Sequence, residues 1–86
     1  MAIGGNLEQL FALQNTLTRN SGAVEALTTS IRNELNNVQW EGPAADRFRA
    51  TWSGEFEPSL RRLREAIDDA ATEVSRRREA LAQAGS

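Results

Sequence analysis

The 86-residue chain contains no cysteine, no histidine and no tyrosine. Without cysteine it has neither a disulfide nor a thiolate that could act as a nucleophile or bind a metal. The absence of histidine removes the commonest general base and the commonest metal ligand of proteins. The sequence also lacks a glycine-rich phosphate loop. It therefore offers no catalytic set and no metal site, and we expect a protein that is not an enzyme and uses no cofactor.

An excess of one charge is lacking as well. The chain has 10 basic and 12 acidic residues and a net charge of -2, which gives no general attraction to nucleic acid or to an anionic membrane. No apolar run approaches the roughly 20 residues that span a bilayer. The first five residues have neither positive charge nor a long apolar core, so they are not a signal peptide. Export by the Sec route is not expected, although another route stays open.

Apolar residues recur at helical spacing through the first half of the chain. Asn6 is a suitable N-cap, with Gln9 at the capping-box position and Gly4–Gly5 before it as a flexible leader. Gly22 would cost about 1 kcal/mol relative to alanine inside a helix and is interpreted as a tolerated weak spot, a close helix crossing being the alternative. A first helix over about residues 7–38 would carry the row Leu10, Leu13, Leu17, Val24, Leu27, Ile31 and Val38, widened by Leu7, Phe11 and Leu35.

A second helix is predicted over about residues 43–82, after a turn at about residues 39–42. Gly42 is acceptable as an N-cap, and Pro43 is favoured at the first helical position. The apolar row again has helical spacing, with steps of three, four or seven residues. Its members are Ala45, Phe48, Trp52, Phe56, Leu60, Leu63, Ile67, Ala70, Val74 and Leu81.

Pro58 interrupts this second pattern. Proline lacks the backbone N–H, and its ring clashes with the carbonyl four residues earlier in a helix. That residue is Gly54, whose missing side chain leaves room for an adjustment. We expect a kink or local irregularity near residues 54–58 with helix on both sides; the alternative is a complete break that gives three helices.

Charged residues fall between the apolar positions of the second helix. Oppositely charged residues four apart predict solvated helix faces with weak ion pairs. They are Glu57, Arg61 and Glu65, and Arg64 with Asp68. The run Arg76–Arg78 is interpreted as complementing the negative end of the helix and pairing with Glu73 and Glu79.

Two long helices joined by a short turn are antiparallel neighbours. Two rods cover only part of each apolar stripe, so the surplus would form an exposed apolar patch, which is typical of an interface. We therefore expect an all-α fold, with a single domain over residues 1–86. In it an antiparallel helix-turn-helix hairpin pairs as a dimer into a four-helix bundle. The predicted core and dimer-interface residues are Leu10, Leu13, Leu17, Leu27, Ile31, Phe48, Trp52, Phe56, Leu60, Leu63 and Ile67.

The tripeptide Trp40-Glu41-Gly42 lies at mid-chain in the predicted turn and opens the segment WEGPAADRFRATW. Ala45, Phe48 and Trp52 follow it. The segment resembles the WXG family of small type VII secretion substrates, whose best-known members are the early secretory antigenic target proteins. W-x-G alone is common; its mid-chain place in a short, cysteine-free chain, between two amphipathic helices, carries the resemblance. A proline at the position of Pro58 is also frequent among actinobacterial members.

The resemblance implies that the chain pairs with a related WXG protein in the cytoplasm. The folded pair would then be secreted, without a cleavable signal peptide, through a membrane complex driven by an FtsK-like ATPase. In the family, export requires a tail signal, a tyrosine followed four residues later by Asp or Glu. The turn of one subunit lies beside the tail of the other, so Trp40 and Gly42 would be the turn motif for secretion.

This sequence departs from the family pattern, because it has no tyrosine and its last six residues are uncharged. We therefore expect it to be the subunit of a heterodimer that lacks the tail signal, with the ATPase reached through the partner's tail. A homodimer stays open. Trp40 serves equally well as an apolar plug that closes the end of the bundle.

Two other functional classes remain as alternatives. A cytosolic adaptor or chaperone-like helical module that escorts a larger secreted protein would share the hairpin and the turn motif. Type VII-dependent appearance in the culture medium separates it from a secreted substrate. A nucleic-acid-binding hairpin predicts affinity that falls steeply with salt, and the net charge of -2 argues against it. The polar faces carry mixed charge and not a basic amphipathic pattern, so stable membrane insertion is not expected.

Overall fold

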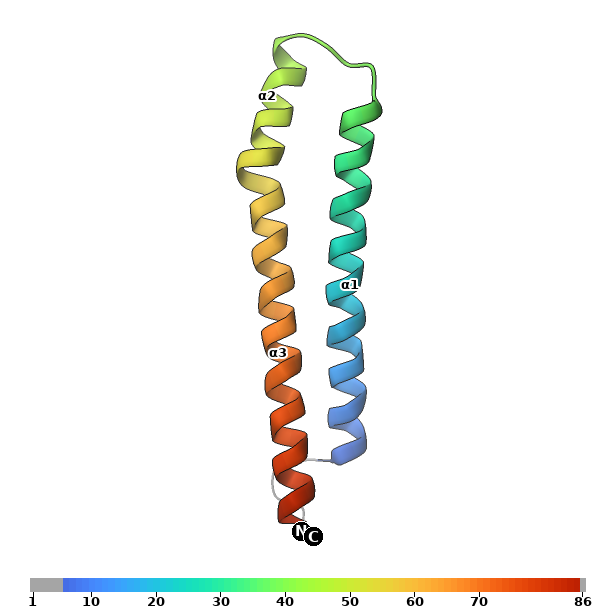
Figure 1. Ribbon diagram of the computed structural model, residues 1–86, viewed down its shortest axis with the longest axis vertical. Coiled ribbons are helices and arrows are strands. Elements are labelled where there is room, and N and C mark those ends of the chain that lie inside the picture. The colour runs from blue at the N-terminus through green and yellow to red at the C-terminus, as the bar shows by residue number, and fades with distance from the viewer. Residues whose placement is uncertain (1–5, 86) are drawn as a thin grey trace.

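The computed structural model describes residues 6–85 as two long antiparallel rods joined by a short turn (Figure 1). The first rod is α1 (Leu7–Asn37). The second rod consists of α2 (Pro43–Thr51), a π-helical segment (Trp52–Phe56) and α3 (Glu57–Ala84). Every regular element among the described residues is helical, and α1 packs along α3. The all-α helical hairpin predicted from the periodicity is confirmed.

Helix α1 begins where the sequence places an N-cap. The Asn6 Oδ1 atom accepts hydrogen bonds from the backbone N–H groups of Glu8, at 2.8 Å, and Gln9, at 3.1 Å. These two bonds satisfy donors that have no partner within the first turn of a helix. The expected leader Gly4–Gly5 lies outside the described residues. A β-carbon on Gly22 would meet no atom within 4 Å, so no close helix crossing requires that glycine.

The turn occupies the residues between Asn37 and Pro43. Gly42 is the N-cap of α2 and has a φ of 114°, a backbone conformation that residues with a β-carbon rarely adopt. Its carbonyl accepts the N–H of Asp46 at 3.0 Å, which closes the first turn of α2. The fixed φ of Pro43 suits the first helical position that follows. Local sequence thus determines where the second rod starts.

The irregularity expected near residues 54–58 is a π-helical segment that begins two residues earlier, at Trp52. The N–H of Glu57 donates to the carbonyl of Trp52, five residues back, where an α-helix would bond four residues back. The backbone stays helical on both sides, and the second rod continues without a break through Ala84, two residues beyond the expected end.

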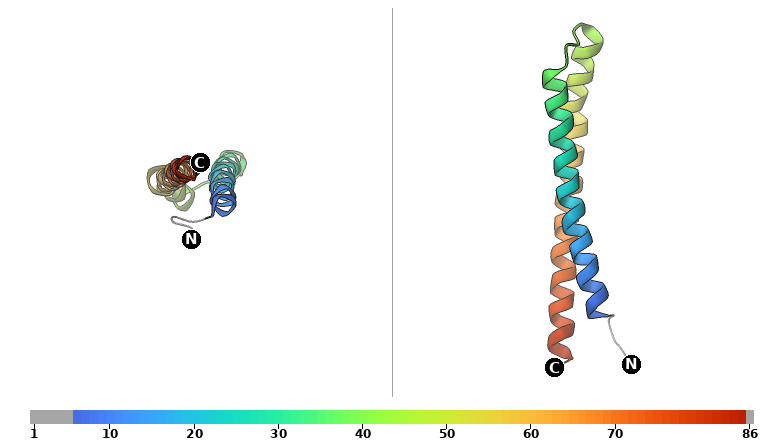
Figure 2. Two further views of the ribbon diagram at one scale, coloured as in Figure 1. Left: turned by 90° about the horizontal axis from the view of Figure 1, so that it is seen from below. Right: turned by 90° about the vertical axis from the view of Figure 1, so that its right-hand side faces the viewer.

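The molecule is a thin rod of 64 × 17 × 15 Å with a radius of gyration of 19.1 Å. A compact domain of this length has a radius of gyration of about 12 Å. Figure 2 shows that the two rods formed by the described residues lie side by side in a single layer. The exposed area is 6421 Å², against about 5,000 Å² for a compact monomer of equal mass. A lone hairpin therefore leaves much apolar surface in water.

Candidate functional site

The structure divides the predicted interface residues into two groups. Trp52 is buried, and Leu10, Leu17, Leu60 and Ile67 are half-buried between the rods. The others are between 36% and 49% exposed, and they are Leu13, Leu27, Ile31, Phe48, Phe56 and Leu63. Val38, from the same apolar row, is 47% exposed. We call the seven exposed residues the open face. The apolar stripe predicted on each helix thus contributes both to the contact between the rods and to the open face.

Small and polar side chains complete the contact between the rods, and sequence reasoning missed them. Ser21, Thr28 and Ala71 are buried, with exposed fractions of 6%, 9% and 8%. The Thr28 hydroxyl donates to the backbone carbonyl of Val24 at 2.7 Å, which satisfies it inside the contact. Ser21 and Thr28 each stand four residues after an apolar residue of the predicted row. Residues four apart lie on the same flank of a helix, so this offset was the sequence signal for their burial.

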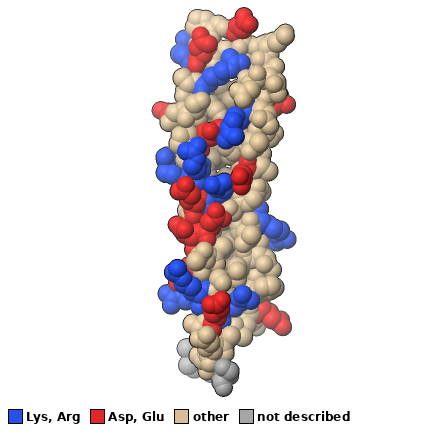
Figure 3. All heavy atoms as spheres, in the orientation of Figure 1, with Lys and Arg blue, Asp and Glu red and all other residues tan. Residues whose placement is uncertain are grey.

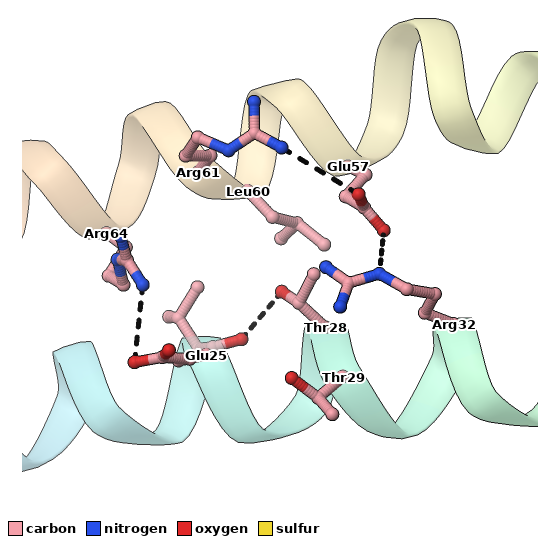
Figure 4. A pocket seen from close by; sticks show the side chains of 9 residues that line it. Glu25, Thr28, Thr29, Arg32, Glu57, Leu60, Arg61 and Arg64 are labelled. Carbon is pink, nitrogen blue, oxygen red and sulfur yellow. Dashed lines mark hydrogen bonds and ion pairs between the residues drawn. The ribbon is translucent and has the colours of Figure 1, made fainter.

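Cross-helix contacts fix the register of the rods along one flank. Arg32 Nε lies 2.8 Å from Glu57 Oε1, and Arg64 Nη1 lies 3.2 Å from Glu25 Oε2 (Figure 4). The two ion pairs are seven residues apart on both helices. A third contact is the Arg78 guanidinium, which stacks 4.8 Å from the ring centre of a phenylalanine on α1, Phe11. It lies a further fourteen residues along each helix, so one heptad register runs the length of the hairpin.

These contacts correct in part the expectation that the charged residues of the second helix lie on solvated faces. Glu57 pairs across the hairpin as well as with Arg61, at 3.8 Å, and its side chain is only 17% exposed. Arg64 pairs with Glu25 of α1, because the heptad register brings those two side chains together. In the run Arg76–Arg78, the first two arginines contact Glu73 as expected, at 3.9 and 2.6 Å.

The open face lies on the other flank of the hairpin. On each rod its helical members directly precede residues that face or contact the other rod, as Leu27 precedes Thr28 and Leu63 precedes Arg64, a rotation of about 100° around the helix. The ion pairs connect the two rods on one side of the contact between them. The open-face residues of both antiparallel rods therefore lie together on the opposite side of that contact. Figure 3 shows one face of the molecule with acidic and basic side chains interspersed over both rods. A face with such mixed charge is suited to contact with solvent.

The π-helical segment aligns the two halves of the second rod. Trp52, the first residue of the segment, and Leu60, which follows its end, both face α1, yet they stand eight residues apart, where a regular heptad would give seven. The π turn absorbs the extra residue. It thereby keeps Trp52 and Leu60 in the contact with α1 and leaves Phe48 and Phe56 exposed together. Three consecutive steps of four, through Phe48, Trp52, Phe56 and Leu60, were the sequence signal for this insertion.

Glu57, the first residue of α3, makes polar contacts with both rods next to the π-helical segment. One of its oxygens, Oε1, accepts hydrogen bonds from Arg32 Nε at 2.8 Å and from Trp52 Nε1 at 3.0 Å. The hydrogen bond from Arg32 is the main cause that lowers the pKa of Glu57 below its ordinary value, with a smaller contribution from Trp52. The same pairing raises the pKa of Arg32. The charged carboxylate therefore holds the buried Trp52 against α1.

We expect the hairpin to lose stability in acid through Glu57. Because its folded pKa is depressed, the carboxylate contributes stability above its unfolded pKa, and this is lost as the pH falls through the folded value. A Glu57→Gln variant should melt below the wild type at pH 7, and the difference should shrink as the pH falls below about 4. Thermal unfolding followed by circular dichroism measures both. A difference that does not change between pH 7 and pH 3 would contradict this role.

The turn presents the predicted motif at one end of the rod. Trp40 is 40% exposed, and its ring packs against the Phe48 ring of α2, with centroids 5.8 Å apart and planes tilted by 53°. Gly42 supplies the positive φ that starts α2. The structure therefore brings Trp40 and Phe48 together at the end of the open face, and Trp40 is neither fully buried nor free of contacts.

The hollow between the ion pairs has a volume of about 110 Å³ and is framed by Glu25, Arg32, Glu57 and Arg64 (Figure 4). These side chains already engage one another, so the hollow belongs to the packing of the hairpin. Among residues 6–85 no three acidic side chains gather in a way that could hold a metal ion. No helix in the described part of the chain is long and apolar enough to cross a membrane.

No family model matches the chain, and neither a curated protein nor a solved structure matches it significantly.

Proposed function

We propose that this chain is a non-enzymatic pairing protein whose open face binds a related helical hairpin to form a four-helix bundle. The observation that carries the proposal is the open face itself, seven large apolar side chains that are 36% to 49% exposed along one flank. Exposed apolar patches of this extent mark interfaces. The opposite flank carries cross-helix ion pairs, which suit water and not a second apolar layer.

The area of the molecule supports a stable pair. The hairpin exposes 6421 Å², roughly 1,400 Å² more than a compact monomer of its mass. Removing such an excess from each of two partners gives about 2,800 Å² in total, which falls in the range of obligate dimers. A second hairpin of similar length would cover the open face of a 64 Å rod from end to end.

The WXG resemblance of residues 40–52 supplies the cellular role in this proposal. The pair forms in the cytoplasm and is secreted folded through a type VII system without a cleavable signal peptide. In this proposal the partner's tail recruits the FtsK-like ATPase. A heterodimer is therefore favoured over a homodimer, and Trp40 and Gly42 provide this subunit's part of the export signal.

We expect the chain to form a 1:1 complex when it is co-expressed with a W-x-G protein encoded beside it. Gel filtration with light scattering measures the complex, and the chain expressed alone is the control. We also expect both proteins in the culture medium of cells with the ATPase and in the cytosol of cells without it. A homodimer that ignores the partner would refute the heterodimer. Retention in the cytosol of ATPase-positive cells would favour the adaptor alternative.

A further inference from the structure

Arg49 of α2 is bonded to the end of α1 and to the turn at the same time. Its Nε and Nη2 atoms donate to the Leu35 carbonyl at 3.3 and 3.2 Å. Nη2 also lies 3.4 Å from the Val38 carbonyl, and Nη1 donates to the Trp40 carbonyl at 2.8 Å. One half-buried guanidinium thus reaches the last helical turn, the C-cap and the turn residue Trp40.

The end of α1 needs such a donor. The last carbonyls of a helix have no partner within it, and many helices end at a glycine or with a basic side chain nearby. Here the C-cap is Val38 in an extended conformation, and the last turn of α1 contains no basic residue. Arg49 supplies from another helix both the hydrogen bonds and the positive charge that suits the negative helix end. The fixed fork of a guanidinium can bond several carbonyls at once.

Arg49 and its neighbour Phe48 together hold Trp40. Arg49 bonds the backbone carbonyl of Trp40, and Phe48 packs against its ring. The N–H of Trp40 also donates to the Val38 carbonyl at 3.1 Å, which itself accepts from Arg49. Trp40 nevertheless remains 40% exposed. A large side chain that is fixed at its backbone and on one ring face, and open on the rest, is pre-organised for contact with another molecule.

We propose that Arg49 is a positioning residue, which sets the orientation in which the turn presents Trp40 to its binding partner. This assignment rests on the proposed function for the identity of that partner, but the ordering of Trp40 by Arg49 does not depend on it. Without the guanidinium, Trp40 keeps its contact with Phe48 but loses the fixed backbone from which the ring projects.

Nuclear magnetic resonance on the full chain tests the ordering directly. In an Arg49→Gln variant, we expect the order parameters of the Trp40 backbone amide and indole N–H to fall below about 0.6, the flexible range. The indole of Trp52, which donates to Glu57, serves as an internal control and should stay ordered. Arg47→Gln makes the same charge change at an exposed position on α2 and should leave Trp40 unchanged.

An Arg49→Lys variant separates positioning from simple stabilisation of the helix end. Lysine keeps the charge but is a point donor that cannot bond three carbonyls in one geometry. We expect it to recover most of the melting temperature lost in Arg49→Gln while Trp40 stays mobile. Recovery of Trp40 order together with the melting temperature would overturn the proposal. So would an unchanged Trp40 order parameter in Arg49→Gln.

Export gives the functional readout. We expect Arg49→Gln to lower the secreted amount about three- to tenfold, the loss that corresponds to giving up the pre-organisation of one large side chain. Pairing through the open face should stay within about twofold, because only Val38 and Phe48 of its seven members lie beside Arg49 and Trp40, and the other five lie farther along the rods. If Trp40→Ala is secreted normally, the proposed role of the turn fails, whereas the order parameters still decide the role of Arg49. If Trp40→Ala blocks secretion and Arg49→Gln does not, the positioning role is refuted.

Discussion

Replacing Leu27 or Leu63 by glutamate will abolish pairing while leaving the hairpin helical. Both side chains belong to the open face, with exposed fractions of 44% and 49%, one from each rod. Because these side chains are about half exposed in the single hairpin, a polar replacement should change the stability of the monomer little. In the pair, the same carboxylate would be buried without a partner, which costs several kcal/mol. We expect the dissociation constant to rise at least about a hundredfold.

Ala26→Glu is the matched control for Leu27→Glu. Ala26 is exposed, lies on the same turn of α1, and points about 100° away from Leu27. It receives the same charge without entering the open face, so its dissociation constant should stay close to that of the wild type. Analytical ultracentrifugation over a concentration series measures the constants, and circular dichroism checks the helix content. Equal effects at Ala26 and Leu27 would show that the open face does not form the interface.

Inserting one alanine between Ser53 and Gly54 will destabilise the hairpin strongly, because the π turn already accommodates one extra residue and the insertion adds a second. Trp52 and Leu60 would then stand nine residues apart, and α2 would rotate by about 100° relative to α3. Trp52, now 6% exposed, would then leave the contact with α1. Loss of a buried large aromatic side chain costs about 3–5 kcal/mol. For a chain of this size we expect the melting temperature to fall by at least about 10 °C.

Two controls separate the register shift from the presence of an alanine side chain in the segment. Ser53 is exposed, so Ser53→Ala, which leaves the length unchanged, should melt close to the wild type. Deleting the exposed Glu55 from the insertion variant restores the length of the segment, so the π turn can form again and most of the stability should return. Melting curves followed by circular dichroism at one protein concentration compare the four chains. An insertion variant that melts with the wild type would refute the role of the π turn in register.

Local sequence was sufficient for most of the fold. Asn6 as N-cap and Gly42–Pro43 as the start of the second rod depend on side chains and backbone preferences within a few residues, so they can be predicted without a partner element. The spacing of the apolar residues likewise determined two amphipathic helices and a hairpin. The irregularity begins two residues before its predicted position, because Pro58 indicates strain but not which preceding residues absorb it.

Only the tertiary structure decided how the apolar stripe is divided. The stripe on each helix is wide enough for two neighbours, and periodicity cannot say which flank closes the hairpin. The cross-helix pairs of Arg32 with Glu57 and of Glu25 with Arg64 place one flank of each rod together. The π turn leaves Phe48 and Phe56 exposed together, although they stand eight residues apart. The same is true of Arg49, whose bonds to the end of α1 exist only because the turn folds α2 back beside it. Residues far apart in the chain make these contacts, so no local pattern contains them.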